Sequence, residues 1–482
     1  MCGIVGYVGK KQAAPFLIEG LKKLEYRGYD SAGVALMHEG QFFCIKRKGT
    51  VAEIASAETL GGNIGIGHTR WATHGAPSEE NAHPHIYGKF AIVHNGILEN
   101  YQSLKEELIE QGDEFLSETD SEVVAHLLSR LYTGNLLYTV KEVVSRLVGS
   151  YAIAVLCLDA PDTIVCVRKS SPLIVGTGEG ESVLASDLPA VAGKGITAYA
   201  LGDGELALLD RSGVKFFGAQ LQSIRKTPLE YDYRMNAPDK KGYMHYMKKE
   251  MSEIPQSVRG SVIDFASETG YSDFYRVLCQ TKQLHIVACG TAYHSGIAAK
   301  YAIERLARIP VEVTIASEFR YMNPVIEAGT LAIAVSQSGE TADTLAAAKL
   351  LKERGATLAA VTNVPYSSLT RLADYVLPTR AGSEIGVAAT KSYNAQLALL
   401  YSLAIALAKA KGRKGRSLEQ LKKLQRLSAE TLRCAESVRS WTPYFVGARC
   451  VLFLGRGADY GAAIEGSLKL KEISYLPSEG YP

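Results

Sequence analysis

The sequence has 482 residues, of which 47% are hydrophobic and 21% are charged. This composition is ordinary for a soluble globular protein and excludes a disordered or fibrous chain, and the length predicts roughly two to four domains. The 53 basic and 50 acidic residues leave a net charge of +3, which is too small a surplus over this length to favour nucleic acid or an anionic membrane as a partner.

The first part of the chain predicts an antiparallel-rich α+β domain over residues 2–217. Short apolar runs predict strands at 3–8, 90–93, 152–158 and 163–167. Amphipathic periodicity predicts helices at 14–25 and 100–111. The apolar alternation then fades, and we expect residues 218–255 to form an interdomain connector that runs into a helix.

From residue 284 the chain alternates strand, glycine-containing turn and helix, which predicts an α/β domain with a parallel sheet and helices on both faces over 276–410. The apolar stretch 395–408 has fourteen residues, fewer than the roughly 20 that span a membrane, so it predicts a buried helix. The basic stretch 409–426 favours a solvated linker over a phosphate-binding patch. Most of this basic stretch lies within residues 411–446, which we predict to form a linker and a helix.

The segment that begins near residue 447 resembles an earlier one. VACGTAYHSGIAAKYAIE followed by ASEFRY resembles FLGRGADYGAAIEGSLKL followed by PSEGYP, and such internal similarity predicts two related α/β domains. The first copy has about 125 residues before the chain turns basic, whereas 447–482 holds only the start of a second. We therefore expect the second domain to be truncated.

The cysteine and histidine patterns do not predict a metal site or a disulfide framework. The eight cysteines include no Cys-x-x-Cys pair. Five of the ten histidines lie between 68 and 94, but no cysteine or carboxylate lies there at ligand spacing. The start MCGIVGYVGKK has neither a basic region nor a long apolar region. We expect a reduced, cytoplasmic protein without a metal or an organic cofactor.

Cys2 is a candidate nucleophile, because removal of Met1 would place a free α-amine on the same residue as the thiol. An α-amine titrates near pH 7.7 to 8.0 and can take the thiol proton directly or through one water. One residue would then supply both nucleophile and base. The alternative is that Cys2 is a small buried apolar residue.

Three other segments complete a possible amide-hydrolysing site. Arg70 can clamp a carboxylate, Asn95 and Gly96 offer the two donors of an oxyanion hole, and Asp120 can neutralise an ammonium group. Together with Cys2 they describe a site for the side-chain amide of free glutamine. Asn-Gly is also a strong hairpin signal, and Arg70 and Asp120 could be surface ion-pair residues.

Two patterns in the second half suggest sugar-phosphate chemistry. The strand at 331–335 ends in SQSGET, whose hydroxyls, amide and helix-start N–H groups suit a phosphate dianion, although Ser and Thr can also be simple helix caps. Glu465, Lys469 and Glu472 are spaced to lie on one face of a helix. Without further information that spacing favours a solvated ladder of charges.

The ordered motifs MCGIVGY, EYRGYDSAG, HTRWATHG, HNGILEN and SETDSE resemble the glutaminase domain of the N-terminal-nucleophile amidotransferases, and the later repeats resemble sugar isomerase (SIS) domains. The combination resembles the family of isomerizing glutamine:fructose-6-phosphate aminotransferases. This resemblance implies an N-terminal-nucleophile glutaminase domain of antiparallel sheets layered with helices, followed by SIS domains with parallel sheets. It also implies that ammonia from glutamine converts fructose 6-phosphate to glucosamine 6-phosphate, in a homodimer formed through the SIS domains.

The resemblance also assigns roles to residues. Cys2 is implied to be the nucleophile, with Asn95 and Gly96 as the oxyanion hole. Glutamine is implied to bind at Arg70, Trp71, Thr73, His74 and Asp120, and Trp71 to gate an ammonia passage. The sugar phosphate is implied to bind at Thr291, Ser336, Gln337, Ser338, Thr341, Val387 and Glu465. Glu472 is implied to be the base that moves a proton between C1 and C2 of the sugar, with Lys469 in support.

The chain departs from the family pattern at Ala292 and Ala389, where many members have serine. The histidine and lysine that act on the sugar in the family are implied to follow residue 482, so we expect glutaminase capacity with little glucosamine 6-phosphate synthesis. A sugar-phosphate sensor with a glutaminase domain is an alternative. A purine-pathway amidotransferase would need an acidic loop after a strand that binds phosphoribosyl diphosphate, and the sequence shows none.

Overall fold

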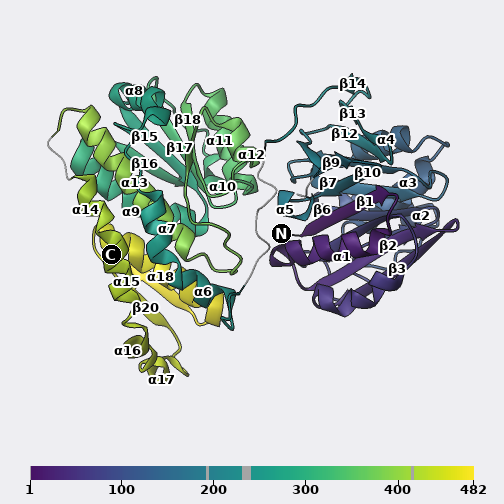
Figure 1. The fold of residues 1–482 in the computed structure, drawn as a ribbon, viewed down its shortest axis with the longest axis horizontal. Coiled ribbons are helices and arrows are strands. Elements are labelled where there is room, and N and C mark those ends of the chain that lie inside the picture. Colours follow the sequence, from purple (N-terminus) through teal and green to yellow (C-terminus); the bar gives the residue numbers. More distant parts are fainter. Residues whose placement is uncertain (1, 192–194, 231–239, 414–416) are drawn as a thin grey trace. The chain divides into compact units, whose positions relative to one another are not determined.

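The computed structural model describes residues 2–191, 195–230, 240–413 and 417–482. Met1, residues 231–239 of the predicted connector and residues 414–416 of the basic stretch lie outside the described residues. The chain divides into two compact units, Met1–Ala237 and Pro238–Pro482 (Figure 1).

The first unit contains two seven-stranded antiparallel sheets. In spatial order, one sheet consists of β11 (Thr197–Ala200), β9 (Ile174–Gly178), β10 (Glu181–Ala185), β1 (Gly3–Gly9), β4 (Ile64–Arg70), β2 (Ser31–His38) and β3 (Gln41–Lys48). The other consists of β14 (Ser223–Ile224), β13 (Gly213–Phe217), β12 (Leu206–Asp210), β8 (Ile164–Lys169), β7 (Gly149–Cys157), β6 (Phe90–Leu98) and β5 (His85–Tyr87). The segment predicted as a connector, 218–255, thus contributes β14 to this sheet.

The two sheets lie between two layers of helices. One layer consists of α1 (Ala13–Leu24), η1 (Glu25–Arg27), η2 (Val51–Thr59) and α5 (Leu188–Val191), and the other of α2 (Tyr101–Glu110), α3 (Glu122–Leu131) and α4 (Leu136–Arg146). Strand β1 shows why both faces of its sheet are covered. Ile4 and Val8 belong to the core between the sheets, whereas Val5 and Tyr7 belong to the core under α1. Side chains alternate across a strand, so a strand that is apolar on both faces needs cover on both.

Asn95 and Gly96 lie inside β6, where they pair with Ala152 and Tyr151 of β7. The hairpin interpretation of this Asn-Gly pair is therefore wrong. Gly96 has φ +136°, and a Cβ there would lie 2.0 Å from the carbonyl oxygen of Ser150. The glycine is required by the close approach of β7 and not by a turn.

The second unit is built on a five-stranded parallel sheet, as the strand and helix alternation predicts. Its strands, in spatial order, are β16 (Val311–Ile315), β15 (Gln283–Ala288), β17 (Thr330–Ser336), β18 (Thr357–Thr362) and β19 (Tyr375–Pro378). Its helices are α6 (Tyr246–Ser252), α7 (Ile254–Ser261), η3 (Thr269–Tyr271), α8 (Ser272–Gln280), α9 (Gly290–Ala307), α10 (Ala316–Phe319), α11 (Ala342–Glu353), α12 (Ser368–Leu372) and α13 (Lys391–Ala410).

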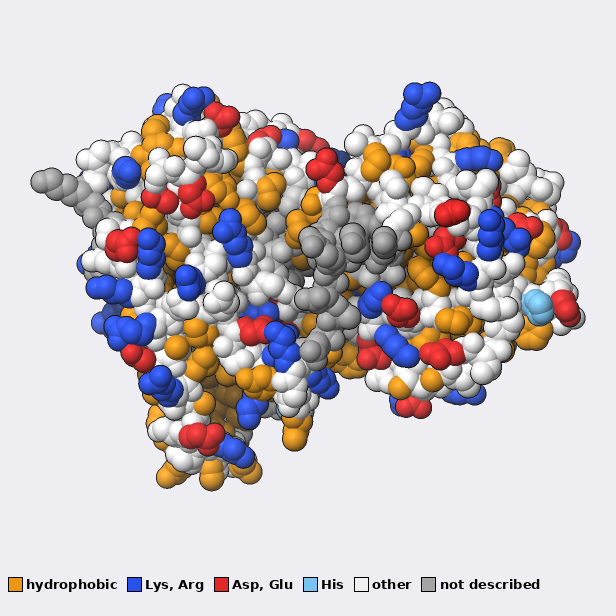
Figure 2. Space-filling view, viewed as in Figure 1, with side chains coloured by type: hydrophobic (Ala, Val, Ile, Leu, Met, Phe, Trp, Pro, Cys, Tyr) orange, Lys and Arg blue, Asp and Glu red, His pale blue; other side chains and the backbone are white. Residues whose placement is uncertain are grey.

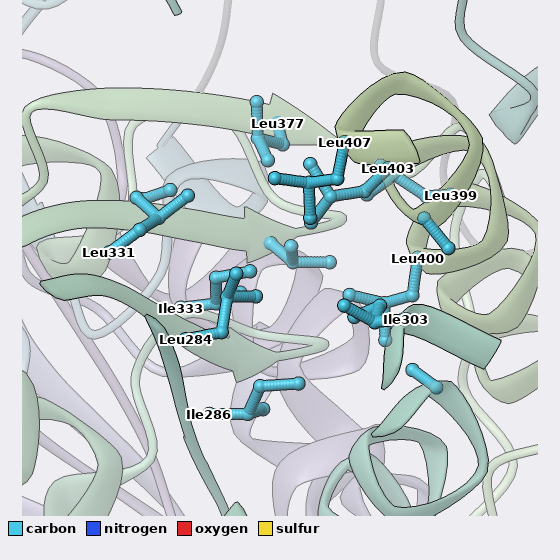
Figure 3. Packing of buried hydrophobic residues seen from close by; sticks show 14 of the residues in the cluster. Leu284, Ile286, Ile303, Leu331, Ile333, Leu377, Leu399, Leu400, Leu403 and Leu407 are labelled. Atoms are coloured by element: carbon cyan, nitrogen blue, oxygen red, sulfur yellow. The ribbon is translucent and has the colours of Figure 1, made fainter. Parts of the chain in front are cut away.

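The two faces of this sheet carry different side chains. On one face, Leu331 and Ile333 of β17 pack with leucines of α13 such as Leu399 and Leu403 (Figure 3). On the other face, Ala332 and Ala334 of β17 pack against α10, α11 and α12. The apolar stretch 395–408 lies within α13, which confirms the prediction of a buried helix.

The last part of the chain begins with short helices and ends in a second parallel strand pair. The helices are α14 (Leu418–Lys422), α15 (Leu424–Leu432), α16 (Ala435–Arg439) and α17 (Thr442–Phe445), followed by β20 (Val451–Leu454), α18 (Ala458–Ser474) and β21 (Ser478–Tyr481). Strand, helix and parallel strand repeat the order β15, α9, β16, which agrees with the predicted internal repeat. The two copies differ at the Ser-Glu pair that each contains. The pair in ASEFRY lies in α10, whereas the pair in PSEGYP lies in β21.

Large apolar side chains lie exposed near this end of the chain. Figure 2 shows hydrophobic side chains gathered over α16 and α17, where Trp441 is 52% exposed and Tyr444 82% exposed. Among the described residues, no helix is both long and apolar enough to cross a membrane.

Candidate functional site

Cys2 immediately precedes β1, and its sulfur contacts the segment that follows β4. The backbone N–H of Trp71 donates a hydrogen bond to Cys2 Sγ over 3.3 Å, and Sγ lies 3.6 Å from the carbonyl oxygen of Trp71. Gly3 of β1 pairs with Thr69 of β4, so the register of the sheet brings Cys2 and Trp71 together. Burial raises the pKa of the Cys2 thiol, while the hydrogen bond with Trp71 acts in the opposite direction.

Two side chains hold the carbonyl oxygen of Cys2. Arg27 Nε donates to it over 3.1 Å, and Asn95 Nδ2 donates to it over 3.1 Å. Arg27 in turn pairs with Asp187 at 3.0 Å. Sequence reasoning missed Arg27 and Asp187. Arg27 lies in the motif EYRGYDSAG, which could have identified it, but nothing near Asp187 in the sequence indicates this role.

His68 orients the Asn95 amide. His68 Nε2 lies 3.0 Å from both Asn95 Oδ1 and the carbonyl oxygen of His94. Burial lowers the pKa of His68 to about 3, so the ring is neutral, and with two oxygen acceptors its proton lies on Nε2. Because Oδ1 accepts from His68, the Asn95 NH₂ group points toward Cys2. An amide nitrogen carries two hydrogens, so one can still be donated to an oxyanion.

Arg70 and Asp120 are both buried, with exposed fractions of 3% and 4%. The surface ion-pair interpretation is therefore wrong for both. The Arg70 guanidinium donates to the carbonyl oxygens of His74, of Gly75 at 3.0 Å and of Ala76 at 3.4 Å. Arg70 thus shapes the loop that contains HTRWATHG.

The other predicted glutamine-site residues lie around the same loop. Asp120 Oδ2 accepts the backbone N–H of Leu98 at 2.8 Å. The Trp71 ring contacts Tyr29 edge to face at 5.6 Å, and the His74 ring contacts Tyr101 at 5.3 Å. Thr73 is exposed at the surface of the loop.

A stack of neutral imidazoles lies beside the Asn95 side chain. His68 stacks on His83 at 4.2 Å, and His83 contacts His85 at 4.5 Å. Burial holds the pKa of His83 well below its usual range and lowers that of His85 to about 3. No group of three or more His, Cys, Asp or Glu side chains within the described ranges could hold a metal ion.

In the second unit, the strand order reverses at one point. The connection after β15 leads to β16 on one side, whereas the connection after β17 leads to β18 on the other side, so the order switches between β15 and β17. Ligands of open parallel sheets bind outside the carboxyl ends of the strands at such a point. Ser336 ends β17 there, and Thr291 follows β15.

The loop after β17 is organised by its own hydroxyl groups. Ser336 Oγ lies 2.9 Å from Thr341 Oγ1 and accepts the backbone N–H of Gly339 at 3.0 Å. Ser338 Oγ accepts the backbone N–H of Glu340 at 3.2 Å. Thr341 occupies the N-cap position of α11 without a side-chain capping bond. The interpretation of Thr341 as a simple helix cap is therefore wrong. Gln337, in the same loop, is half-buried.

Helices α9 and α18 bring Thr291 and the predicted charged triplet together. Glu465 accepts from Thr291 Oγ1 at 3.0 Å and pairs with His294 Nδ1 at 2.8 Å. Lys469 Nζ contacts Thr291 Oγ1 at 2.9 Å and Glu472 at 2.5 Å. Glu465 is only 5% exposed, so it is not part of a solvated ladder. Sequence reasoning missed His294, although it lies one turn after Thr291.

The loop between β19 and α13 carries the remaining predicted residue. Val387 is 60% exposed in this loop. Ala292 is buried in the first turn of α9, and Ala389 is half-buried.

Comparisons with known proteins match a domain in each unit. The glutamine amidotransferase domain profile matches residues 68–193, and the SIS domain profile matches residues 277–406. Glutamine--fructose-6-phosphate aminotransferase (isomerizing) of Caldanaerobacter subterraneus subsp. tengcongensis is 47% identical, with all of this chain and 82% of that protein covered. The protein of the same name from Clostridium tetani is 48% identical with the same coverage. The C-terminal domain of glucosamine-fructose-6-phosphate aminotransferase from Francisella tularensis aligns with a TM-score of 0.49 and 40% identity, covering 51% of this chain and 72% of that chain.

Proposed function

This chain belongs to the family of isomerizing glutamine:fructose-6-phosphate aminotransferases, and we propose that it releases ammonia from glutamine at Cys2 and uses it to convert fructose 6-phosphate to glucosamine 6-phosphate. The contact between Cys2 Sγ and the Trp71 amide carries the first half of this proposal. The hydroxyl-lined loop at the sheet switch point carries the second half.

The first step requires a base for the thiol. Burial raises the Cys2 pKa, so the thiol does not ionise by itself near neutral pH. After removal of Met1, the Cys2 α-amine lies on the same residue and accepts this proton. Attack of the sulfur on the glutamine amide carbon forms a tetrahedral oxyanion, and the same amine returns the proton to the departing ammonia. Water then hydrolyses the thioester and releases glutamate.

The oxyanion is stabilised by the Asn95 amide and by the backbone N–H of Gly96. Donors fixed before the reaction cost no reorganisation as charge develops, and the neutral His68 fixes Asn95 in this way. Arg70 binds the α-carboxylate of glutamine and Asp120 its ammonium group. An arginine has five N–H donors, so its contacts to the loop carbonyls leave capacity for a carboxylate. Trp71, Thr73 and His74 close the site.

The sugar half binds the phosphate at Ser336, Gln337, Ser338 and Thr341. Thr291 and Glu465 hold the sugar at the adjacent carboxyl end of β15, together with Val387. Glu472 transfers a proton between C1 and C2, and Lys469, which contacts both Glu472 and Thr291, holds its carboxylate in place. General base catalysis needs a carboxylate held within reach of the proton it removes.

We further propose a homodimer formed through the SIS region and a cytoplasmic location. Exposed aromatic side chains such as Trp441 and Tyr444 support an interface in the second unit. The eight free cysteines support a reducing compartment. Analytical ultracentrifugation that shows only a monomer at micromolar concentration would refute the proposed homodimer.

The test combines three measurements on the purified chain. Mass spectrometry is expected to show that Met1 is absent, and ammonia release is expected to require glutamine and Cys2. Calorimetry is expected to show binding of fructose 6-phosphate, and glucosamine 6-phosphate is assayed in parallel. If the chain does not bind fructose 6-phosphate, the sugar half of this proposal is refuted. An active protein that retains Met1 would refute the role of the α-amine.

A further inference from the structure

Glu250 of α6 is completely buried, with an exposed fraction of 0%. Its carboxylate accepts the backbone N–H of Ile385 at 2.5 Å and that of Gly386 at 3.2 and 3.1 Å, one distance to each oxygen. Burial raises the pKa of this carboxyl, and the two backbone donors act in the opposite direction. A buried charge is retained only where hydrogen bonds replace water, and here a loop backbone supplies them.

The fit between the carboxylate and the loop is close. A Cβ on Gly386 would lie 2.6 Å from Glu250 Oε2, so a larger residue there would displace the carboxylate. Glu253, just after α6, pairs with Lys391 Nζ at 2.6 Å, and Lys391 is 2% exposed at the first position of α13. Residues 250–253 therefore contact both the middle of the loop between β19 and α13 and the first residue of α13.

A different residue, Asn363, joins residues 381–382 of this loop to the phosphate-binding loop. Asn363, directly after β18, accepts the backbone N–H of Ala381 at 3.0 Å and donates to the carbonyl oxygen of Gly382 at 2.7 Å. Its own backbone N–H donates to the carbonyl oxygen of Gln337 at 3.1 Å. Val387 follows Gly386 and is exposed, so the Glu250 contact fixes the backbone next to a residue of the proposed sugar site.

We infer that Glu250 is a positioning residue for the sugar-phosphate site: its carboxylate fixes residues 385–387 so that the Val387 backbone meets the sugar part of the ligand. The phosphate is bound by a different loop, which Glu250 does not contact in the structure. Loss of Glu250 should therefore weaken binding of the sugar and leave binding of the phosphate group intact. This inference rests on the proposed function, because it requires fructose 6-phosphate to bind beside Val387.

The test compares Glu250→Gln with the unchanged chain and with the control Glu353→Gln, an exposed glutamate of α11. Glutamine keeps the size of the side chain but replaces one carboxylate oxygen with an NH₂ group, which cannot accept the Gly386 N–H that Oε2 now accepts, and it removes the charge. Calorimetry with fructose 6-phosphate is expected to show roughly tenfold weaker binding for E250Q. Binding of inorganic phosphate is expected to be unchanged, and hydrogen exchange in peptides covering 383–388 is expected to accelerate. E353Q should match the unchanged chain in all three.

A second variant approaches the same contact from the loop. Gly386→Ala places a methyl group against the carboxylate and is expected to reproduce the E250Q pattern. Equal fructose 6-phosphate affinity in E250Q and the unchanged chain would overturn the inference while leaving the proposed function intact. Equal loss of phosphate and sugar-phosphate binding would also overturn it, because it would indicate a general structural role. If the unchanged chain did not bind fructose 6-phosphate, the sugar half of the proposed function would fail first, and this inference with it.

Discussion

The backbone N–H of Trp71 donates a hydrogen bond to the sulfur of Cys2 over 3.3 Å. An amide donor aimed at sulfur stabilises a thiolate more than a thiol, because the hydrogen bond is stronger to a charged acceptor. Burial has the opposite effect and raises the Cys2 pKa. The thiol is therefore held neutral until a base accepts its proton.

Cys2→Ala should remove ammonia release from glutamine, by roughly a thousandfold or more, because no other group in the site replaces the nucleophile. The measurement is ammonia production by the purified variant. Cys434→Ala changes an exposed cysteine and should keep full activity. Ammonia release by C2A at the rate of the unchanged chain would contradict the proposed mechanism.

His68→Leu should lower kcat for glutamine hydrolysis by about tenfold or more, with a smaller effect on KM. Leucine cannot donate to Asn95 Oδ1, so the amide loses its orientation toward the developing oxyanion. His68→Gln retains a donor and should recover part of the rate. If both variants lost activity to the same extent together with thermal stability, His68 would have only a packing role.

The first unit should become less stable as the pH falls below about 6.5. His68 and His85 have pKa values lowered to about 3 from a usual 6.5, so below pH 6.5 the unfolded chain binds protons that the folded chain does not. Stability is complete above pH 6.5 and is lost as the pH falls toward about 3, by roughly 1.4 kcal/mol per pH unit for each histidine.

Urea unfolding at about pH 7.5 and about pH 5.5 measures this loss, since few carboxylates titrate in that range. His83→Phe keeps an aromatic ring against His68 and should reduce the pH dependence by one proton. His38→Phe changes an exposed histidine and should leave it unchanged. A free energy of unfolding that did not change between the two pH values would show that these histidines are not buried as neutral rings.

Ser336→Ala should weaken binding of both inorganic phosphate and fructose 6-phosphate by roughly tenfold. The change removes a hydroxyl from the proposed phosphate site and also the acceptor for the Gly339 N–H. Calorimetry with each ligand tests it, with the exposed Ser440→Ala as the matched control. Unchanged phosphate affinity would place the phosphate elsewhere, and the contrast with E250Q separates the two loops.

Leu403→Ala should destabilise the second unit by about 3 kcal/mol, because Leu403 is fully buried between α13 and the sheet. Leu427→Ala removes the same atoms from a side chain that is 45% exposed and should have a smaller effect. Chemical denaturation of both variants tests the difference. Equal losses would indicate that α13 does not form the main core.

The sequence was informative wherever a local pattern decides the structure. Alternation of apolar residues predicted β1 and α1 to within two residues, and the fourteen-residue, mainly apolar stretch 395–408 predicted the buried α13. The SQSGET loop was also predictable, because strand, turn and helix follow each other without interruption. Asn95–Gly96 was ambiguous, because its conformation depends on β7, which begins 53 residues later.

The sequence by itself therefore determined the two fold classes, the family and the chemical types of the candidate site residues, since these follow from local periodicity and from ordered motifs. Tertiary structure alone decided which residues meet. Asp187 reaches Arg27, and Glu250 reaches Ile385 and Gly386, across more than a hundred residues. Such contacts depend on strand order and helix packing, and short-range sequence patterns carry no information about them.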